Sequence, residues 1–114
     1  MNDVSDSPLG KLLVARKAAR TFAARYAGRT VLAVGAHPDD IELGIGATVA
    51  LLARSGARVV MAVCSVPGDY EVRRAEALDA AGILGCELRI LMDGGSRRIE
   101  DVKTYQLVGM IDDV

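Results

Sequence analysis

The sequence predicts an α/β fold, a three-layer α/β/α sandwich built on a Rossmann-like parallel sheet that is truncated after three strands. Three short apolar runs, each typical of a buried strand, alternate with helical segments of about 10–15 residues. This alternation indicates βαβ units with right-handed connections. The chain has 114 residues, of which 51% are hydrophobic and 25% charged, as expected for one globular domain. Three strands are few for this architecture, so residues 8–114 are expected to be the N-terminal part of a single domain.

A first helix is predicted from Pro8 to a stop at Gly28, after a disordered tail over residues 1–7. Proline is favoured at the first position of a helix and glycine just after its end. Between them, leucine, alanine and aromatic residues recur at helical spacing, with basic residues at the intervening positions. We interpret this segment as an amphipathic helix packed on the domain with a solvated basic face. Contact with an anionic surface and a transit peptide are the alternatives.

The remaining elements follow from the same two patterns. Short apolar runs bounded by turn residues predict strands, and helical spacing that ends at a glycine predicts helices. On these grounds strands are expected at residues 30–35, 58–65 and 87–91. Helices are expected at about residues 43–55, 71–84 and 101–113.

Composition excludes several classes of function. The net charge is −1 and the pI about 5.8, so the chain as a whole has no electrostatic basis for binding nucleic acid. No apolar run approaches the roughly 20 residues of a transmembrane helix, and basic residues interrupt the segment where a secretory signal would be apolar. Cys64 and Cys86 form no CxxC pair, and Cys64 is interpreted as a small core residue rather than a ligand. This cysteine usage favours a cytoplasmic protein.

The most informative segment is VLAVGAHPDDIELGIGAT, residues 31–48, which holds the one histidine of the chain. It places His37, Asp39 and Asp40 at the carboxyl end of the first predicted strand, where open α/β sheets bind their ligands. Zinc binds imidazole nitrogen and carboxylate oxygen, and a carboxylate beside the metal can take a proton from water. The pattern predicts that His37 and one aspartate bind a metal while the other aspartate acts as a base. Glu42 is expected to accept a hydrogen bond from His37 or to interact with the N-terminus of the helix that follows.

The segment AHPDDIELGIGAT resembles the signature of the LmbE-like, PIG-L family of zinc-dependent N-deacetylases, which has the form AHPDDxExGxGGT. Ala47 stands where the second glycine of GGT is usual. Two further segments, SVPGD and RRAEALDAAGILGC, are similar to a loop and a helix of the same family, so the likeness extends over residues 31–114. The resemblance implies a hydrolase that removes an acetyl group from an N-acetylglucosamine-type amide of a glycan or glycoconjugate.

Residue by residue, the resemblance implies that His37 and Asp40 are metal ligands and that Asp39 is the general base that activates water. It implies Zn²⁺ as the cofactor, with iron as the alternative, and a small-molecule sugar amide as the substrate. Arg73 matches a substrate-contacting arginine that is followed by a glutamate three residues later. Asp93 matches an aspartate that contacts sugar hydroxyls.

One part of this family's site has no counterpart in the sequence. The family's third metal ligand is a histidine from a downstream HxxH-type segment, and this chain has one histidine in total. Zinc sites take three or four protein ligands, so two alone bind weakly. We therefore expect the front part of a longer enzyme; the alternative is a non-catalytic truncated α/β remnant or a partner-binding module. A phosphate-binding loop at GIGAT is disfavoured, since GxGxxG is incomplete and no Walker lysine follows.

Overall fold

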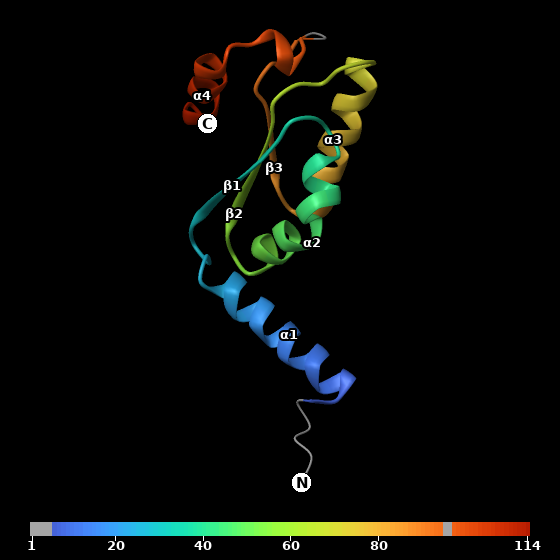
Figure 1. Ribbon diagram of the computed structural model, residues 1–114, viewed down its shortest axis with the longest axis vertical. Coiled ribbons are helices and arrows are strands. Elements are labelled where there is room, and N and C mark those ends of the chain that lie inside the picture. The colour runs from blue at the N-terminus through green and yellow to red at the C-terminus, as the bar shows by residue number, and fades with distance from the viewer. Residues whose placement is uncertain (1–5, 95–96) are drawn as a thin grey trace.

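The computed structural model describes residues 6–94 and 97–114 and shows three strands alternating with helices (Figure 1). Helix α2 connects β1 to β2 and α3 connects β2 to β3, which is the βαβ arrangement that the sequence predicts. The elements follow the chain in the order α1 (Pro8–Ala24), β1 (Thr30–Gly35), α2 (Asp40–Arg54), β2 (Arg58–Val63), α3 (Tyr70–Leu84), β3 (Glu87–Ile90), the 3-10 helix η2 (Ile99–Asp101) and α4 (Thr104–Asp112).

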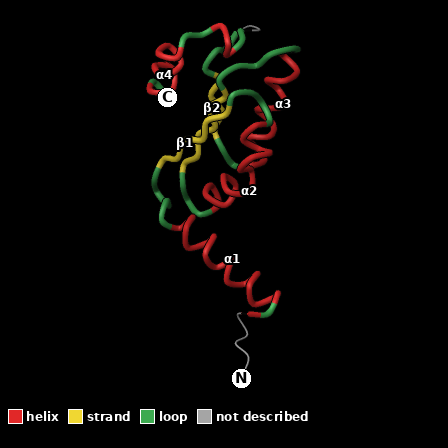
Figure 2. Tube along the Cα trace, in the orientation of Figure 1, coloured by secondary structure: helices red, strands yellow, loops and turns green. Residues whose placement is uncertain are grey.

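The three strands form one parallel sheet in the order β1-β2-β3, and Figure 2 shows the strands grouped together in the body of the molecule. β1 pairs with β2 along its whole length, from Thr30 opposite Arg58 to Gly35 opposite Val63. β2 pairs in turn with β3 up to Ile90. The predicted α/β fold class is therefore confirmed. Because the strands are parallel, their carboxyl ends and the loops that follow them gather at one edge of the sheet.

The core lies between one face of the sheet and the helices α2 and α3 (Figure 1). The inward side chains of β2 are Val59, Met61 and Val63, each at most 2% exposed. They belong to the same buried cluster as Val49 and Leu52 of α2. Removal of this apolar surface from water is the main favourable term in folding, so the packing of α2 on the sheet holds the start of α2 in place.

The opposite face of the sheet is covered only in part. Helix α4 lies on that side in Figure 1, and Val114 after it lines a cavity of about 90 Å³ together with residues of the sheet. Leu32 and Val34 of β1 remain 41% and 45% exposed on this face. The central strand β2 is better covered, since Val60 and Ala62 are buried. Helices therefore flank both faces of the sheet, but they cover the two faces unequally.

Some element boundaries differ from the predicted ones. Helix α2 begins at Asp40, earlier than expected, because Asp39 already occupies its N-cap position. Strands β2 and β3 end slightly earlier than predicted. The single helix expected over residues 101–113 is instead η2 followed by α4, since Val102 and Lys103 between them have extended backbone.

The N-terminal helix differs most from its prediction. The expected disordered tail lies mostly outside the described residues, and Ser7 within it caps α1 by accepting from Gly10 N at 2.9 Å. The expectation that α1 packs on the domain is wrong for most of its length. Only its C-terminal end is anchored, where Ala23 is 0% exposed and the rings of Phe22 and Tyr26 lie 5.2 Å apart. The rest of α1 projects from the body, which makes the molecule 62 Å long and about 25 Å wide (Figure 1).

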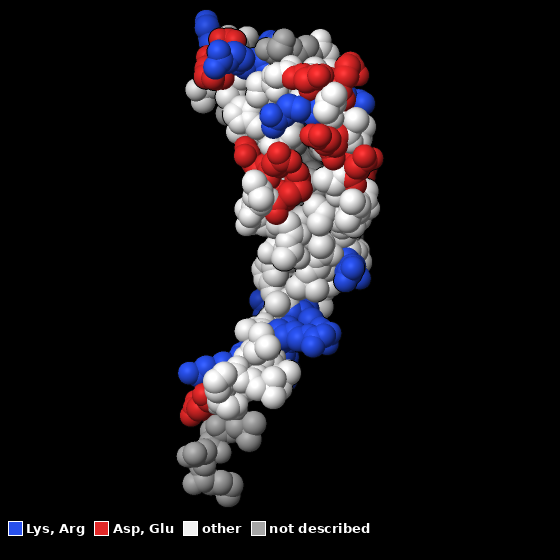
Figure 3. All heavy atoms as spheres, turned by 90° about the vertical axis from the view of Figure 1, so that its right-hand side faces the viewer, with Lys and Arg blue, Asp and Glu red and all other residues white. Residues whose placement is uncertain are grey.

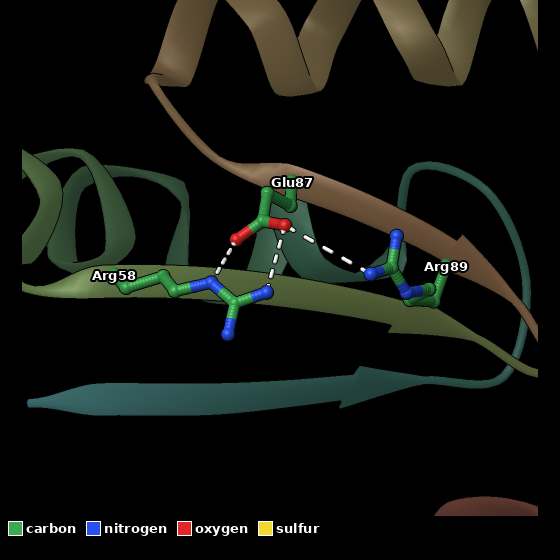
Figure 4. Close-up of polar contacts among 3 residues, drawn as sticks. All are labelled: Arg58, Glu87 and Arg89. Atoms are coloured by element: carbon green, nitrogen blue, oxygen red, sulfur yellow. Dashed lines mark hydrogen bonds and ion pairs between the residues drawn. The ribbon is translucent and has the colours of Figure 1, made fainter.

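An ion pair joins the amino ends of β2 and β3 (Figure 4). Arg58 donates two hydrogen bonds to Glu87, one of them from Nη2 to Oε1 at 3.0 Å, and Arg89 Nη2 lies 3.9 Å from the same oxygen. The hydrogen bond from Arg58 lowers the pKa of the Glu87 carboxyl, as do the charges of Arg58 and Arg89, while burial acts in the opposite direction. The pair supports the strand register at the end of the sheet that lies away from the carboxyl-end loops.

Candidate functional site

The HPDD loop leaves the carboxyl end of β1 and leads directly into α2. His37 N donates to Asp40 Oδ2 at 2.9 Å, and Asp40 N donates to His37 O at 3.3 Å. Pro38 between them is buried, and its ring restricts the backbone of the turn. His37 Nδ1 lies 3.8 Å from Asp40 Oδ2, and the two side chains are 39% and 50% exposed. The turn therefore holds an imidazole and a carboxylate side by side within reach of solvent.

Asp39 occupies the N-cap of α2 with a left-handed backbone, φ 80° and ψ −23°. It is the only non-glycine residue with positive φ in the part of the chain that the structure describes. This conformation costs a non-glycine residue about 1–2 kcal/mol, and residues held in it gather at functional sites. Glu42 supports the turn, since its Oε2 accepts from Asp39 N at 3.1 Å. Glu42 thus contacts the helix N-terminus, and its alternative role as a partner of His37 stays a prediction.

Gly35 allows α2 to start close to β1. A Cβ atom at this position would lie 2.9 Å from Ile41 Cγ1 and 3.3 Å from Asp40 Cβ, closer than packed side chains tolerate. Ile41 is 3% exposed and packed in the core, so it has no free space to move into. The glycine that ends β1 therefore sets how closely Asp40 approaches His37.

The pair of His37 and Asp40 fits the donor chemistry of a divalent metal ion. A nitrogen and an oxygen 3.8 Å apart can both reach one zinc ion, whose bonds to such atoms are about 2.0–2.2 Å long. A catalytic zinc site, however, typically has three protein ligands. Within residues 6–94 and 97–114, no group of three or more His, Cys, Asp or Glu side chains is placed to hold a metal ion. The described residues thus present a partial ligand set.

The two predicted substrate residues lie at the same edge of the sheet as the HPDD loop. Asp93 follows β3, and its Oδ1 lies 3.7 Å from Nε of Arg74 in α3. The sequence predicts Arg73 as the substrate contact, and the structure pairs its neighbour Arg74 with Asp93. The hydroxyl of Tyr70 accepts from the backbone N–H after Asp93 at 3.0 Å, which ties the start of α3 to this loop. Arg73 is half-buried at that start and forms no ion pair within the described residues.

Glu100 of η2 has an electrostatic link to His37 that the sequence does not predict. The pKa of its carboxyl lies below the ordinary value, first through its own backbone hydrogen bond and further through Arg98 and His37, while burial acts in the opposite direction. Arg98 Nη2 donates to Glu100 Oε1 at 3.1 Å. No pattern around Glu100 distinguishes it from other surface carboxylates, so the sequence holds no signal for it.

Cys64 follows β2 beside the HPDD loop, since its backbone N donates to Gly35 O at 2.9 Å, but neither cysteine joins His37 and Asp40 in a group of three possible ligands within the described residues. Cys64 is 3% exposed in the interior, as its apolar run predicts, and both thiols are free. Burial raises the pKa values of Cys64 and Cys86, which favours the neutral thiol over the thiolate that binds metal.

Comparison with known proteins points to one family. The family model described as PIG-L, GlcNAc-PI de-N-acetylase, matches residues 32–114. An uncharacterized deacetylase, YaiS of Escherichia coli K12, is 38% identical over 88 residues, which cover 74% of this chain and 47% of that protein. A 1D-myo-inositol 2-acetamido-2-deoxy-alpha-D-glucopyranoside deacetylase of Acidothermus cellulolyticus is 39% identical over 61 residues, which cover 50% of this chain and 21% of that protein. The chain thus spans less than half the length of these relatives.

A solved structure supports the fold. The crystal structure of GalB, the 4-carboxy-2-hydroxymuconate hydratase of Pseudomonas putida KT2440, is similar to this chain with a TM-score of 0.50 and 26% sequence identity. The similarity covers 63% of this chain and 38% of GalB. Because GalB is named a hydratase, the shared fold does not by itself decide the reaction, which has to be argued from the residues of the site.

Proposed function

Since the chain belongs to the PIG-L (LmbE-like) deacetylase family, we propose that it acts as a metal-dependent N-deacetylase that removes an acetyl group from an N-acetylglucosamine-type sugar amide. One observation carries the proposal. The HPDD loop brings an imidazole nitrogen within 3.8 Å of a carboxylate oxygen, and the second carboxylate of the loop, Asp39, is exposed next to them. This loop leaves the carboxyl end of β1, the place where α/β sheets bind substrates.

His37 and Asp40 are the proposed metal ligands. Zinc is the first candidate and iron the second, because imidazole and carboxylate donors accept both. When bound, the ion supplies Lewis-acid polarisation of the amide carbonyl and of the attacking water. Two ligands do not complete a catalytic zinc site, so the proposal requires at least one further ligand from outside the described residues.

Asp39 is the proposed general base. It takes a proton from water while the water oxygen bonds to the carbonyl carbon of the acetyl group. The C–N bond then breaks, the proton passes to the sugar nitrogen, and acetate and a free amine leave. The position of Asp39 supports this role, since its exposed side chain lies between the two proposed ligands in sequence and its backbone is held by Glu42.

Arg73 and Asp93 are the proposed contacts to the sugar. A carboxylate can accept from two sugar hydroxyls and a guanidinium can donate to sugar oxygens. The pairing of Arg74 with Asp93 holds the loop after β3 against α3, which favours a fixed position for the carboxylate. The name of the Acidothermus relative describes an N-acetylglucosamine joined to inositol, so this is the first substrate to test. A cytoplasmic location is proposed from the two free cysteines.

Release of acetate tests the proposal. The full-length protein is incubated with N-acetylglucosamine, its inositol glycoside and diacetylchitobiose, in the presence of zinc or of a chelator. We expect acetate from at least one substrate, and only with metal. Asp39→Asn is expected to lower the rate by about 100-fold or more while the protein retains its metal. His37→Ala is expected to lower both the rate and the metal content.

The matched control is Asp79→Asn, the same change at an exposed position of α3, which is expected to leave the rate unchanged. Loss of metal in Asp39→Asn contradicts the assignment of Asp39 as the base and makes it a ligand. Absence of acetate from every substrate at every metal concentration contradicts the deacetylase function and favours a non-catalytic, partner-binding module.

A further inference from the structure

Helix α1 has no part in the candidate site and lies outside the family match, which begins at residue 32. It projects from the body as a 17-residue helix, about 25 Å long at 1.5 Å per residue (Figure 1). Only the end near Ala23 is buried against the domain. Neither the packing of the sheet nor the chemistry of the HPDD loop accounts for this long, exposed helix.

The outer end of α1 is an exposed apolar tip. It consists of Leu9, Leu12, Leu13 and Val14, which are 65%, 64%, 52% and 56% exposed. Leu9, Leu12 and Leu13 share one face of the helix at the spacing i, i+3 and i+4, and Val14 adds exposed apolar surface on the adjacent side. Exposed apolar surface of this kind marks an interaction site. Lys11 lies within the tip, and its long aliphatic stem allows its ammonium group to reach a polar boundary.

The rest of α1 and the turn after it form a basic segment. It consists of Arg16, Lys17, Arg20, Arg25 and Arg29, all of them exposed. With Lys11, six of the chain's 14 Lys and Arg lie between Pro8 and Arg29, and none of its 15 Asp and Glu does. Figure 3 shows basic side chains along α1, whereas most acidic side chains lie toward the opposite end of the molecule, where basic side chains lie among them. No ion pair within the described residues neutralises them.

The combination of tip and basic segment decides which partner fits. A polyanion such as nucleic acid would engage the cations but leave the leucines exposed. A second copy of α1 would cover the leucines but bring two sets of six cations together. An anionic lipid surface satisfies both parts, because apolar side chains enter the boundary of the acyl chains while Lys and Arg contact phosphates. No described helix is long and apolar enough to span a membrane, so such contact would be made at the surface.

We propose that α1 docks the protein on an anionic phospholipid surface, with the apolar tip inserted below the headgroups and the basic segment on the phosphates. The proposal does not depend on the deacetylase function. It assigns α1 as a membrane-binding arm that holds the domain, and the HPDD loop with it, next to the lipid surface.

Cosedimentation of the full-length protein with vesicles tests the proposal. The vesicles contain phosphatidylcholine alone or with about 30% phosphatidylglycerol, which gives the negative surface that attracts Lys and Arg. We expect binding only to the anionic vesicles. Raising the salt from about 0.1 M to about 1 M, which shortens the Debye length from about 10 Å to about 3 Å, is expected to release most of the protein.

Two variants separate the parts of α1. Arg16→Gln/Arg20→Gln is expected to weaken binding about 25-fold, at about fivefold for each charge near the surface. Leu12→Ser/Leu13→Ser is expected to weaken it by about tenfold or more for each leucine that leaves the acyl boundary. The matched controls are Arg54→Gln/Arg97→Gln for charge and Val72→Ser/Ile83→Ser for exposed apolar residues on α3, 51% and 86% exposed. Circular dichroism confirms that each variant retains its helices.

Several results would overturn the proposal. These are absence of binding to anionic vesicles, equal binding to neutral vesicles, and equal losses in the control variants. Insensitivity to Leu12→Ser/Leu13→Ser combined with binding to heparin would show a general polyanion site instead. Self-association that the leucine variant abolishes, without vesicle binding, would show that a second copy covers the tip.

Discussion

Replacement of Gly35 by alanine is expected to destabilise the protein and to displace the HPDD loop. The added Cβ would lie 2.9 Å from Ile41 Cγ1, 3.3 Å from Asp40 Cβ and 3.4 Å from Ile41 Cδ1. None of these contacts is made by a freely moving side-chain end, because Ile41 is 3% exposed. The first turn of α2 must therefore move away from β1. Overpacking of this kind costs about 1–3 kcal/mol, and we expect the free energy of unfolding to fall by that amount.

Urea unfolding of a double-mutant cycle measures the effect. Ile41→Ala alone removes a buried side chain and is expected to cost about 2–5 kcal/mol. In Gly35→Ala/Ile41→Ala the new methyl group occupies part of the space that Ile41 leaves. The double variant should therefore be more stable than the sum of the single effects by about 1–2 kcal/mol. Gly82→Ala in α3, where a Cβ meets nothing within 4 Å, is the matched control and is expected to gain up to about 1 kcal/mol.

The close contact of Gly35 with α2, rather than the loss of a glycine as such, is expected to cause the change. Unfolding of Gly35→Ala at the same urea concentration as the wild type, or additive effects of the substitutions at Gly35 and Ile41, would refute this cause. A further consequence follows for the site. Since Asp40 moves with the first turn of α2, metal binding by Gly35→Ala is expected to be weaker than that by Gly82→Ala.

Three other substitutions test separate features. Asp39→Gly relieves the strain of the left-handed backbone at φ 80°. It is expected to raise the free energy of unfolding in urea by up to about 1 kcal/mol while abolishing acetate release. A lower free energy of unfolding would contradict the inferred backbone strain at Asp39. Glu87 has a lowered pKa because Arg58 donates to its ionised carboxylate. This stabilisation is present above the pKa of the unfolded chain and is lost as the pH falls through the lowered folded pKa. In thermal unfolding at a series of pH values, the difference between wild type and Glu87→Gln should therefore close on acidification; a difference that grows would contradict the sign. Ser65 is 0% exposed, and its Oγ has no hydrogen-bond partner among the described residues. Ser65→Ala is expected to stabilise the protein by about 1 kcal/mol in urea unfolding, and a clear destabilisation would show that the hydroxyl has a partner.

Local patterns in the sequence were sufficient to predict the alternation of strands and α-helices and the place of the HPDD loop at the carboxyl end of β1. The apolar run at residues 30–35 is β1 without any change of boundary, and Gly85 ends α3 with a left-handed backbone, φ 77°. Both depend on short-range chemistry, namely apolar content between turn residues and the freedom of glycine at a helix end. The predicted start of α2 at about residue 43 is later than the observed start at Asp40, because aspartate is favoured both in turns and at the N-cap of a helix.

Features that depend on tertiary packing were harder to predict. The spacing of apolar residues in α1 is the same whether the helix packs on the domain or projects from it, so the sequence could not distinguish the two. The choice between adjacent arginines is a similar case. Arg73 and Arg74 differ by one position in the chain, and only the direction of α3 decides that Arg74 lies near Asp93. The electrostatic link between Glu100 and His37 joins segments far apart in sequence, and no local pattern predicts it.

The order β1-β2-β3 gives the site an asymmetric setting. Among the described strands β1 lies at the edge of the sheet, so the loop that carries His37 has the loops of β2 and β3 on one side and no described strand on the other. A further strand that paired with this edge in parallel would also end beside His37, because parallel strands end at the same edge of a sheet. Its following loop could then add a donor to His37 and Asp40. If such a loop supplied a ligand, pairing of the added strand would also complete the ligand set, and folding and metal affinity would then be thermodynamically coupled.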